Sequence, residues 1–291
     1  MMSVASLQFN KPKAPSPGKV KVEGGAKVQF VVDGNKTVLK HLYQHDPVRI
    51  LFPNNPPGEL TIGVLTTTSG GLVGGDKIVI EVDAGPNTQS MIMAQAAEKI
   101  YRSAGDDCLI DIAVNADEGA WFEWLPQETI LHQGARMRRQ TNLALSGDAR
   151  ILAGEFLVFG RHAMGEKMTQ GLVRDCWNVS VDGRAVWADA FHMDGALDEI
   201  IDHPAGLSGA TAVANCVYAG PDAMDRLDLA RDLLIEHEQV RSGATVVNGV
   251  LLIRCLGSDV FSLRKLFADF WMKFRNQVGG QPERLPRLWD I

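Results

Sequence analysis

The sequence lacks several features that mark large classes of proteins. Its 291 residues contain no unbroken apolar run of the roughly 18 to 20 residues that a membrane-spanning helix needs. Basic residues form no run either, because 29 Lys and Arg are interspersed with 35 Asp and Glu, and the net charge is -6. The sequence therefore predicts neither a membrane span nor a nucleic-acid partner.

Cysteine is also scarce. The four cysteines lie far apart in the sequence, without a CxxC pair or the dense spacing of a disulfide framework. They are Cys108, Cys176, Cys216 and Cys255. Isolated cysteines of this kind are typical of reduced, buried thiols, so we expect a cytoplasmic protein.

Signatures of nucleophilic catalysis and nucleotide binding are missing. No GxSxG elbow occurs. Residues 69–76, SGGLVGGD, have the glycine spacing of a phosphate-binding loop, but Asp76 and Lys77 stand where that loop requires Lys and then Ser or Thr. We therefore interpret the segment as a structural glycine loop that follows a tight backbone path. Its glycines are Gly70, Gly71, Gly74 and Gly75.

What is present favours a packed β-rich fold. Apolar residues make up 45% of the chain and charged residues 22%, a balance typical of globular proteins. Apolar and polar residues alternate in many short segments, as in half-buried strands. The expected strands are residues 20–39, 48–52, 77–83, 89–94, 108–114, 128–133, 138–145, 173–181 and 185–190. Gly24-Gly25, Gly34-Asn35 and Asp182-Gly183 are the expected turns.

The last third of the chain is different. Helical spacing of apolar residues predicts one helix over residues 222–241 and a second that begins after Ser258 and ends near Gly279-Gly280. Residues 244–256 between them are expected to form a single buried strand. The sequence thus predicts a mainly β fold with two α-helices in the C-terminal third. We expect one domain over residues 20–291, after a disordered leader over residues 1–19.

Several carboxylates stand in or beside apolar segments, where an ionised group must be paired, hydrated or bound to metal. They are Asp76, Glu123, Glu128, Glu155 and Glu166. Structural ion pairs are one explanation. A carbohydrate-active enzyme that uses two carboxylates, such as Glu123 and Glu128, is another. Paired carboxylates in an open cleft would favour the enzyme.

Four stretches of the sequence resemble one known family. They are SGGLVGGD at residues 69–76, EKIYRS at 98–103, EWLPQETI at 123–130 and FGRHAMGE at 159–166. Weaker likeness extends from residue 45 to the ending PRLWDI at residues 286–291. In the order and spacing of these stretches, the chain is similar to the UreD (UreH) family of urease accessory proteins.

This resemblance implies a fold of stacked sheets wound in a helix-like manner, and a scaffold without a reaction of its own. It also implies three partners: the accessory protein UreF, through it the GTPase UreG, and apo-urease. Nickel(II) would pass transiently to the urease metallocentre, with no tightly bound cofactor. A pure adaptor without a metal path remains an alternative.

The resemblance gives roles to particular residues. Carboxylates bind a passing nickel ion weakly enough to release it, so the candidates for a nickel conduit are Asp76, Glu128, Glu155 and Glu166. The second helix carries an aromatic stripe wider than one core face usually needs. Phe267, Phe270 and Trp271 of this stripe are therefore expected either to be structural or to contact UreF.

Overall fold

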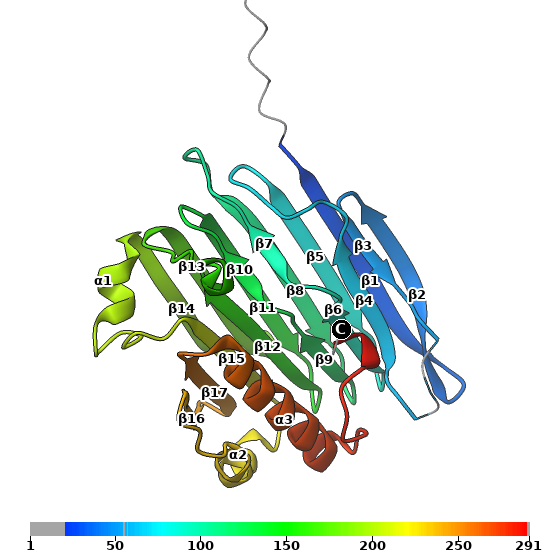
Figure 1. The fold of residues 1–291 in the computed structure, drawn as a ribbon. Helices are drawn as coiled ribbons and strands as arrows, with labels where there is room; N and C mark the ends of the chain where they lie inside the picture. Colours follow the sequence, from blue (N-terminus) through cyan, green and yellow to red (C-terminus); the bar gives the residue numbers. More distant parts are fainter. Residues whose placement is uncertain (1–20, 55, 57, 290–291) are drawn as a thin grey trace, which may run out of the picture.

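The computed structural model describes residues 21–54, 56 and 58–289, and two stacked β-sheets dominate it (Figure 1). The leader expected over residues 1–19 lies outside the described residues. Sheet A has the order β14 (Arg184–Ala196), β13 (Gln170–Val181), β11 (Arg136–Leu145), β8 (Cys108–Ala116), β5 (Lys77–Ala84), β1 (Glu23–Asp33) and β2 (Lys36–His45).

Sheet B has the order β16 (Val240–Val247), β17 (Val250–Gly257), β15 (Ala212–Ala219), β12 (Arg150–Phe159), β9 (Trp121–Leu125), β6 (Gln89–Ala94), β4 (Thr61–Thr67) and β3 (Val48–Leu51). Two short strands, β7 (Glu98–Ile100) and β10 (Thr129–Leu131), pair with each other, and β10 also pairs with β12. From β4 to β13 the long strands alternate between the sheets and pair in parallel within each sheet. The chain is therefore mostly β and wound like a solenoid, as predicted.

Apolar side chains fill the space between the sheets. In β5, Ile78, Ile80 and Val82 point into this core, because alternate residues of a strand face the same side. Sheet B is buried on its other face as well, so β12 is apolar with almost no alternation. That pattern explains why residues 150–159 gave no strand signal of period two.

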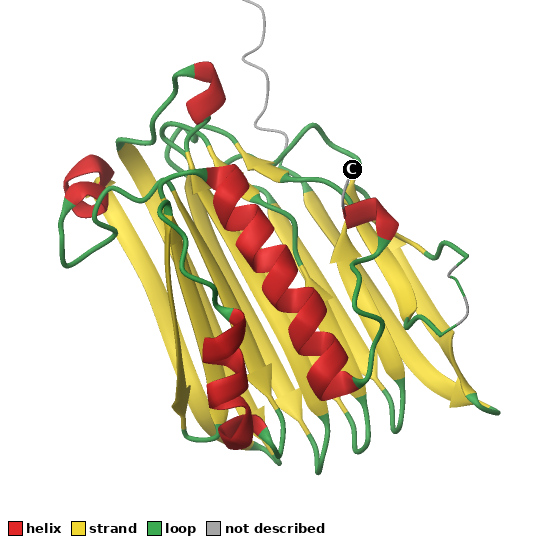
Figure 2. Ribbon diagram, turned by 60° about the horizontal axis from the view of Figure 1, so that its bottom comes forward, coloured by secondary structure: helices red, strands yellow, loops and turns green. Residues whose placement is uncertain are grey.

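Three α-helices accompany the sheets: α1 (Leu197–Asp202), α2 (Leu227–Leu233) and α3 (Val260–Gly279). The long helix α3 lies across one face of the sheets (Figure 2). Its ends agree with the prediction: the Asp259 side chain accepts a hydrogen bond from the Ser262 amide at 2.7 Å, and Gly280 ends the helix in the left-handed conformation. Short 3-10 turns occur at His162–Met164, Ala223–Arg226 and Arg287–Trp289. Within the described part of the chain, no helix combines the length and apolarity needed to cross a membrane.

Three local predictions were wrong. The helix expected over residues 222–241 is limited to a 3-10 turn and α2, because residues from Val240 onward pair with β17. The single strand expected over residues 244–256 is a hairpin, β16 and β17, which turns at Asn248-Gly249 with positive φ at both residues. Gly24-Gly25 is no turn but lies within β1, where a Cβ on Gly24 would come within 2.4 Å of Pro47 Cδ.

Candidate functional site

Two neighbouring strands of sheet B are interrupted at the same level. One interruption separates β6 from β7, at residues 95–97, and the other separates β9 from β10, at residues 126–128. A cavity of about 270 Å³ lies at these breaks between the two sheets. A space of this size holds several water molecules.

The cavity has an apolar floor and a polar rim. On the inner face of sheet A it is lined by Ile78, Ile80, Ile110, Ile112, Thr141 and Trp177. Among the lining residues, Gly70, Ala96 and Lys99 are exposed, so they mark where the cavity opens. The walls also carry hydroxyl groups from Thr66, Thr67 and Thr129.

Glu98 places a carboxylate at the rim of the cavity. Its Oε2 accepts a hydrogen bond from Thr67 Oγ1 at 2.5 Å, and its Oε1 accepts one from the Lys99 amide at 3.1 Å. Burial raises the pKa of Glu98, although these two hydrogen bonds act to lower it. Glu98 was not among the predicted site residues, although it opens the matched stretch EKIYRS.

Glu155 lies at the deep end of the cavity, as part of a buried ionic cluster. Arg139 donates to Glu155 Oε2 at 2.7 Å and also binds Asp175, while Trp177 Nε1 donates to Glu155 at 3.0 Å. The side-chain amide of Asn215 donates to the other Glu155 oxygen. The cluster joins β11 and β13 of sheet A to β12 and β15 of sheet B.

The pKa values of the two carboxyl groups in this cluster are shifted in opposite directions. Burial, reinforced by the neighbouring Glu155 charge, raises the pKa of Asp175 despite the attraction of Arg139. For Glu155, the effect of burial is outweighed by the hydrogen bonds from Asp175, Asn215 and Trp177 and by the Arg139 charge, so its pKa is lowered. Of the two carboxyl groups, Glu155 is the one that lines the cavity.

The structure does not bring the four predicted conduit carboxylates together. Asp76 accepts from the amides of Val22 and Val73, at 3.1 and 2.9 Å, and so fixes the start of β1 beside the glycine loop. Glu128 pairs with Arg264 of α3. Glu166 pairs with Arg161 and accepts from the Gln133 amide at 3.0 Å. Of the four, Glu155 is the one that lines the cavity, and a role for any of them in nickel passage stays a prediction.

The glycine loop shows where the backbone has no room for a side chain. A Cβ on Gly74 would lie 2.0 Å from Ser103 Oγ and 2.1 Å from the Asp106 carbonyl oxygen. Gly71 and Gly75 have positive φ, at 140° and 99°. Gly70 has open space around its Cβ position and stands at the cavity mouth instead.

Glu123, the other carboxylate considered for catalysis, is fully buried under α3. It pairs there with Arg275, while Trp121 and Trp271 donate to it from Nε1 at 2.9 and 2.8 Å. Glu123 and Glu128 each bind an arginine of α3 and do not face an open cleft as a pair. The geometry that the carbohydrate-enzyme alternative required is therefore not found at these residues.

The aromatic stripe of α3 packs onto sheet B. Phe267, Phe270 and Trp271 are at most 2% exposed, so they leave no surface for a partner and serve the core. Contact of these residues with UreF stays a prediction. Phe261, in the first turn of the helix, is 81% exposed.

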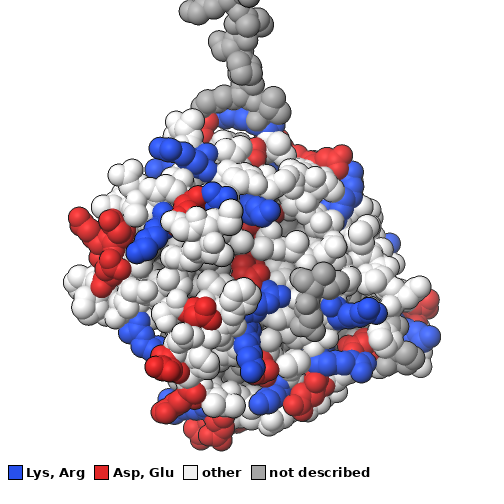
Figure 3. All heavy atoms as spheres, in the orientation of Figure 1, with Lys and Arg blue, Asp and Glu red and all other residues white. Residues whose placement is uncertain are grey.

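The described residues hold no group of three or more His, Cys, Asp or Glu side chains placed to bind a metal ion. On the face shown in Figure 3, cationic and anionic side chains are interspersed over the surface. The cavity between the sheets is therefore the candidate site, with Glu98 at its rim and Glu155 at its deep end.

Comparison with known proteins places the chain in a family. The family model described as "UreD urease accessory protein" matches residues 22–290. The chain belongs to the UreD family of urease accessory proteins. A urease accessory protein UreD of Magnetococcus marinus is 45% identical over 295 residues, covering 100% of both chains. Those of Azorhizobium caulinodans and Xanthobacter autotrophicus are each 37% identical, over 96% and 99% of this chain and 100% and 94% of their own.

In this member of the UreD family, the four matched stretches run side by side at one end of the stack. Leu72 of the first bridges to Ile100 of the second. The second then pairs with the third through β7 and β10. Leu131, directly after the third, pairs with Phe159, the first residue of the fourth. Segments far apart in sequence thus form one row beside the cavity mouth, which includes Gly70 and Lys99.

Proposed function

We propose that this chain is a urease maturation scaffold that bridges apo-urease and the accessory proteins UreF and UreG and helps deliver nickel(II) to the urease metallocentre. It catalyses no reaction in this proposal. Membership of the UreD family over nearly the whole chain is the observation that carries it. A cytoplasmic location fits the four cysteines, which are all free and buried.

The cavity supports the delivery part of the proposal. Nickel(II) in transit needs ligands that bind weakly and in succession, because a tight site would retain it. Carboxylate and hydroxyl oxygens meet this need, and the cavity offers Glu98 and Thr67 at its rim and Glu155 at its deep end. Nickel is cargo here and not a resident cofactor.

Arg139 brings a positive charge to the wall of the cavity. A guanidinium in the wall repels a cation unless carboxylates neutralise it. Arg139 binds both Glu155 and Asp175, so its charge is compensated. The wall near Glu155 is therefore suited to a hydrated cation rather than to direct coordination by several protein ligands.

The bridging role is tested by co-expression with the urease gene cluster. Tagged apo-urease is purified from cells with and without this chain, and UreF and UreG are measured in the eluate. The proposal expects both accessory proteins with apo-urease only when this chain is present. Equal recovery without it would overturn the bridging role. Normal bridging with nickel loading that is insensitive to cavity variants would leave a pure adaptor.

A further inference from the structure

The break in sheet B at residues 126–128 is braced from outside by the end of the chain. Trp289 Nε1 donates a hydrogen bond to the carbonyl oxygen of Pro126 at 2.8 Å, and the side-chain amide of Gln127 donates to the carbonyl oxygen of Trp289 at 3.0 Å. Pro126 and Gln127 line the cavity, whereas Trp289 belongs to the apolar cluster between sheet B and α3. Trp289 therefore stands directly behind the wall of the cavity.

Arg264 of α3 holds both the tryptophan and the break. Its guanidinium carbon lies 3.9 Å from the centre of the Trp289 ring, and its Nη2 donates to the Trp289 carbonyl oxygen at 2.5 Å. Its Nη1 donates to Gln127 Oε1 at 2.6 Å and also binds Glu128. The indole ring stacks on Phe267 as well, with the ring centres 6.4 Å apart. One arginine and one tryptophan thus contact all three residues of the break.

The break at residues 95–97 is exposed instead. Gln95 and Ala96 face solvent there, whereas Gln127 in the other break is 6% exposed. The difference arises because α3 and the residues that follow it cover residues 126–128. The cavity therefore has one wall that borders solvent and one wall that depends on the end of the chain.

We propose that Trp289 is a positioning residue and that residues 286–289 act as a strap on the cavity wall. While docked, the strap holds residues 126–128 in place and keeps the cavity narrow. On release it lets this wall move outward, so the cavity widens. Of residues 286–289 only Trp289 is buried, so release costs much less than global unfolding. The inference rests on the proposed delivery role for its purpose, because a wider cavity admits a hydrated ion more readily.

The test measures access to the cavity without nickel or partners. Thr141 lines the cavity from sheet A and is 1% exposed, so Thr141→Cys introduces a probe thiol of nearly equal size. Cys108 is buried in the same core but is not among the cavity-lining residues, so it reports general loosening of the fold. Both thiols are labelled with methyl methanethiosulfonate, and the two rates are followed separately by mass spectrometry.

Trp289→Phe keeps an aromatic ring against Arg264 and removes the hydrogen bond to Pro126. It should raise the labelling rate of the probe thiol by about two- to tenfold, the change in a local opening equilibrium that the loss of one hydrogen bond causes. The Cys108 rate should not change. Trp289→Ala also removes the ring and should raise the rate of the probe further.

Phe261→Ala is the matched control, because it removes an exposed ring from the helix that carries Arg264 and should change neither rate. An unchanged probe rate in the Trp289→Phe variant would overturn the strap. A Cys108 rate that rises by the same factor as the probe rate would also overturn it, because Trp289 would then serve the stability of the whole fold. Since labelling needs no nickel, either failure is distinct from failure of the delivery role.

Discussion

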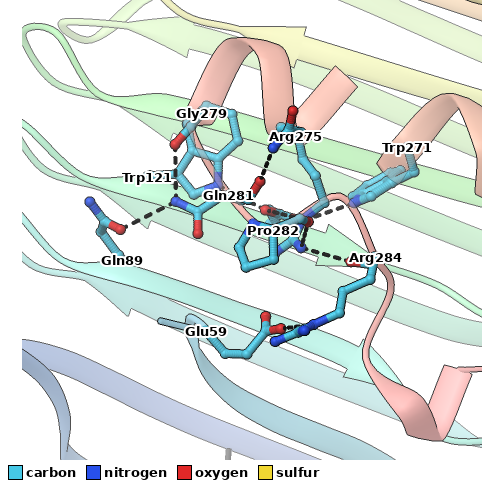
Figure 4. A network of polar contacts seen from close by, with 11 residues as sticks. Glu59, Gln89, Trp121, Trp271, Arg275, Gly279, Gln281, Pro282 and Arg284 are labelled. Carbon is cyan, nitrogen blue, oxygen red and sulfur yellow. Dashed lines mark hydrogen bonds and ion pairs between the residues drawn. The ribbon is translucent and has the colours of Figure 1, made fainter. Parts of the chain in front are cut away.

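Arg275 of α3 donates from Nε to both carboxylate oxygens of Glu123 on β9, at 3.0 Å each, and neither side chain has any exposed surface. Arg275 also donates from Nη1 to the carbonyl oxygens of Pro282 and Arg284, at 2.9 Å each (Figure 4). One arginine thus ties the long helix to sheet B and to the chain that follows the helix. Arg284 itself pairs with Glu59 near the start of β4.

Breaking this pair should destabilise the whole protein. Glu123→Gln leaves Arg275 as an uncompensated buried charge, which costs about 3–5 kcal/mol. Urea denaturation should show the loss as a lower midpoint. Glu81→Gln, at an exposed ion pair, serves as the control and should cost no more than about 1 kcal/mol. Equal midpoints for the two variants would show that the buried pair does not hold α3 in place.

The aromatic stripe of α3 should behave as core. Phe270→Ala removes a ring with 1% exposure and should cost about 3–5 kcal/mol in the free energy of unfolding. Phe261→Ala lies on the same helix at 81% exposure and should change stability by about 0.5 kcal/mol or less. Thermal unfolding of both variants checks the contrast, and a well-folded Phe270→Ala protein of wild-type stability would contradict the packing described.

Replacing Gly74 or Gly70 of the glycine loop by alanine should change the stability of the protein in different ways. Gly74→Ala forces its Cβ against a backbone carbonyl and should cost about 1–3 kcal/mol or more. Gly70→Ala meets open space, so it should be neutral or stabilise by about 0.4–1 kcal/mol. The midpoints of denaturant unfolding for the two variants test this contrast.

The glycine loop should not bind nucleotide. Calorimetry with GTP or ATP should give no saturable binding to the parent chain, because the phosphate-binding Lys and hydroxyl are absent.

Glu98 should make stability depend on pH. Burial raises its folded-state pKa above the unfolded value, so the folded state binds the proton more tightly. Its contribution is therefore fully present below the unfolded pKa and is lost as the pH rises through the folded pKa. The stability of Glu98→Gln relative to wild type should therefore increase as the pH rises from about 4 to about 7. The unfolding free energies of both proteins at the two pH values test the sign, and a gap that moves the other way would refute it.

Much of the fold follows from local patterns. The alternation of Ile78, Ile80 and Val82 predicted β5, and Asp182-Gly183 predicted the turn between β13 and β14. The apolar stripe and the glycine pair at its end placed α3. These elements each have one buried face, so their periodicity is visible in the sequence.

Other features depend on contacts that no local pattern records. β9 and β12 are buried on both faces and so have no period of two. Helical spacing after Leu233 was overridden by the pairing of β16 with β17. Which carboxylates face the cavity is decided by the strand breaks at residues 95–97 and 126–128. Of the two carboxylates that line the cavity, sequence reasoning named Glu155 and not Glu98.

The four predicted conduit carboxylates now give distinct expectations. Asp76, Glu128 and Glu166 bind backbone amides or arginines outside the cavity, so Asp76→Asn, Glu128→Gln and Glu166→Gln should alter assembly and nickel loading together or not at all. Glu155→Gln also weakens the Arg139 cluster, so its folding must be checked by thermal unfolding before its nickel loading is interpreted.

Delivery through the interior is tested most directly by the nickel content per urease active site after co-expression with Glu98→Gln. Glu98 lines the cavity mouth and has no arginine or lysine ion pair among the described residues, so its loss should leave the complex intact. Glu81→Gln is the control, and pull-down confirms assembly for both variants. We predict wild-type assembly with lowered nickel for Glu98→Gln, and wild-type values of both for Glu81→Gln. Full nickel loading with Glu98→Gln, and also with a folded Glu155→Gln protein, would contradict the interior route and leave the chain as an adaptor alone.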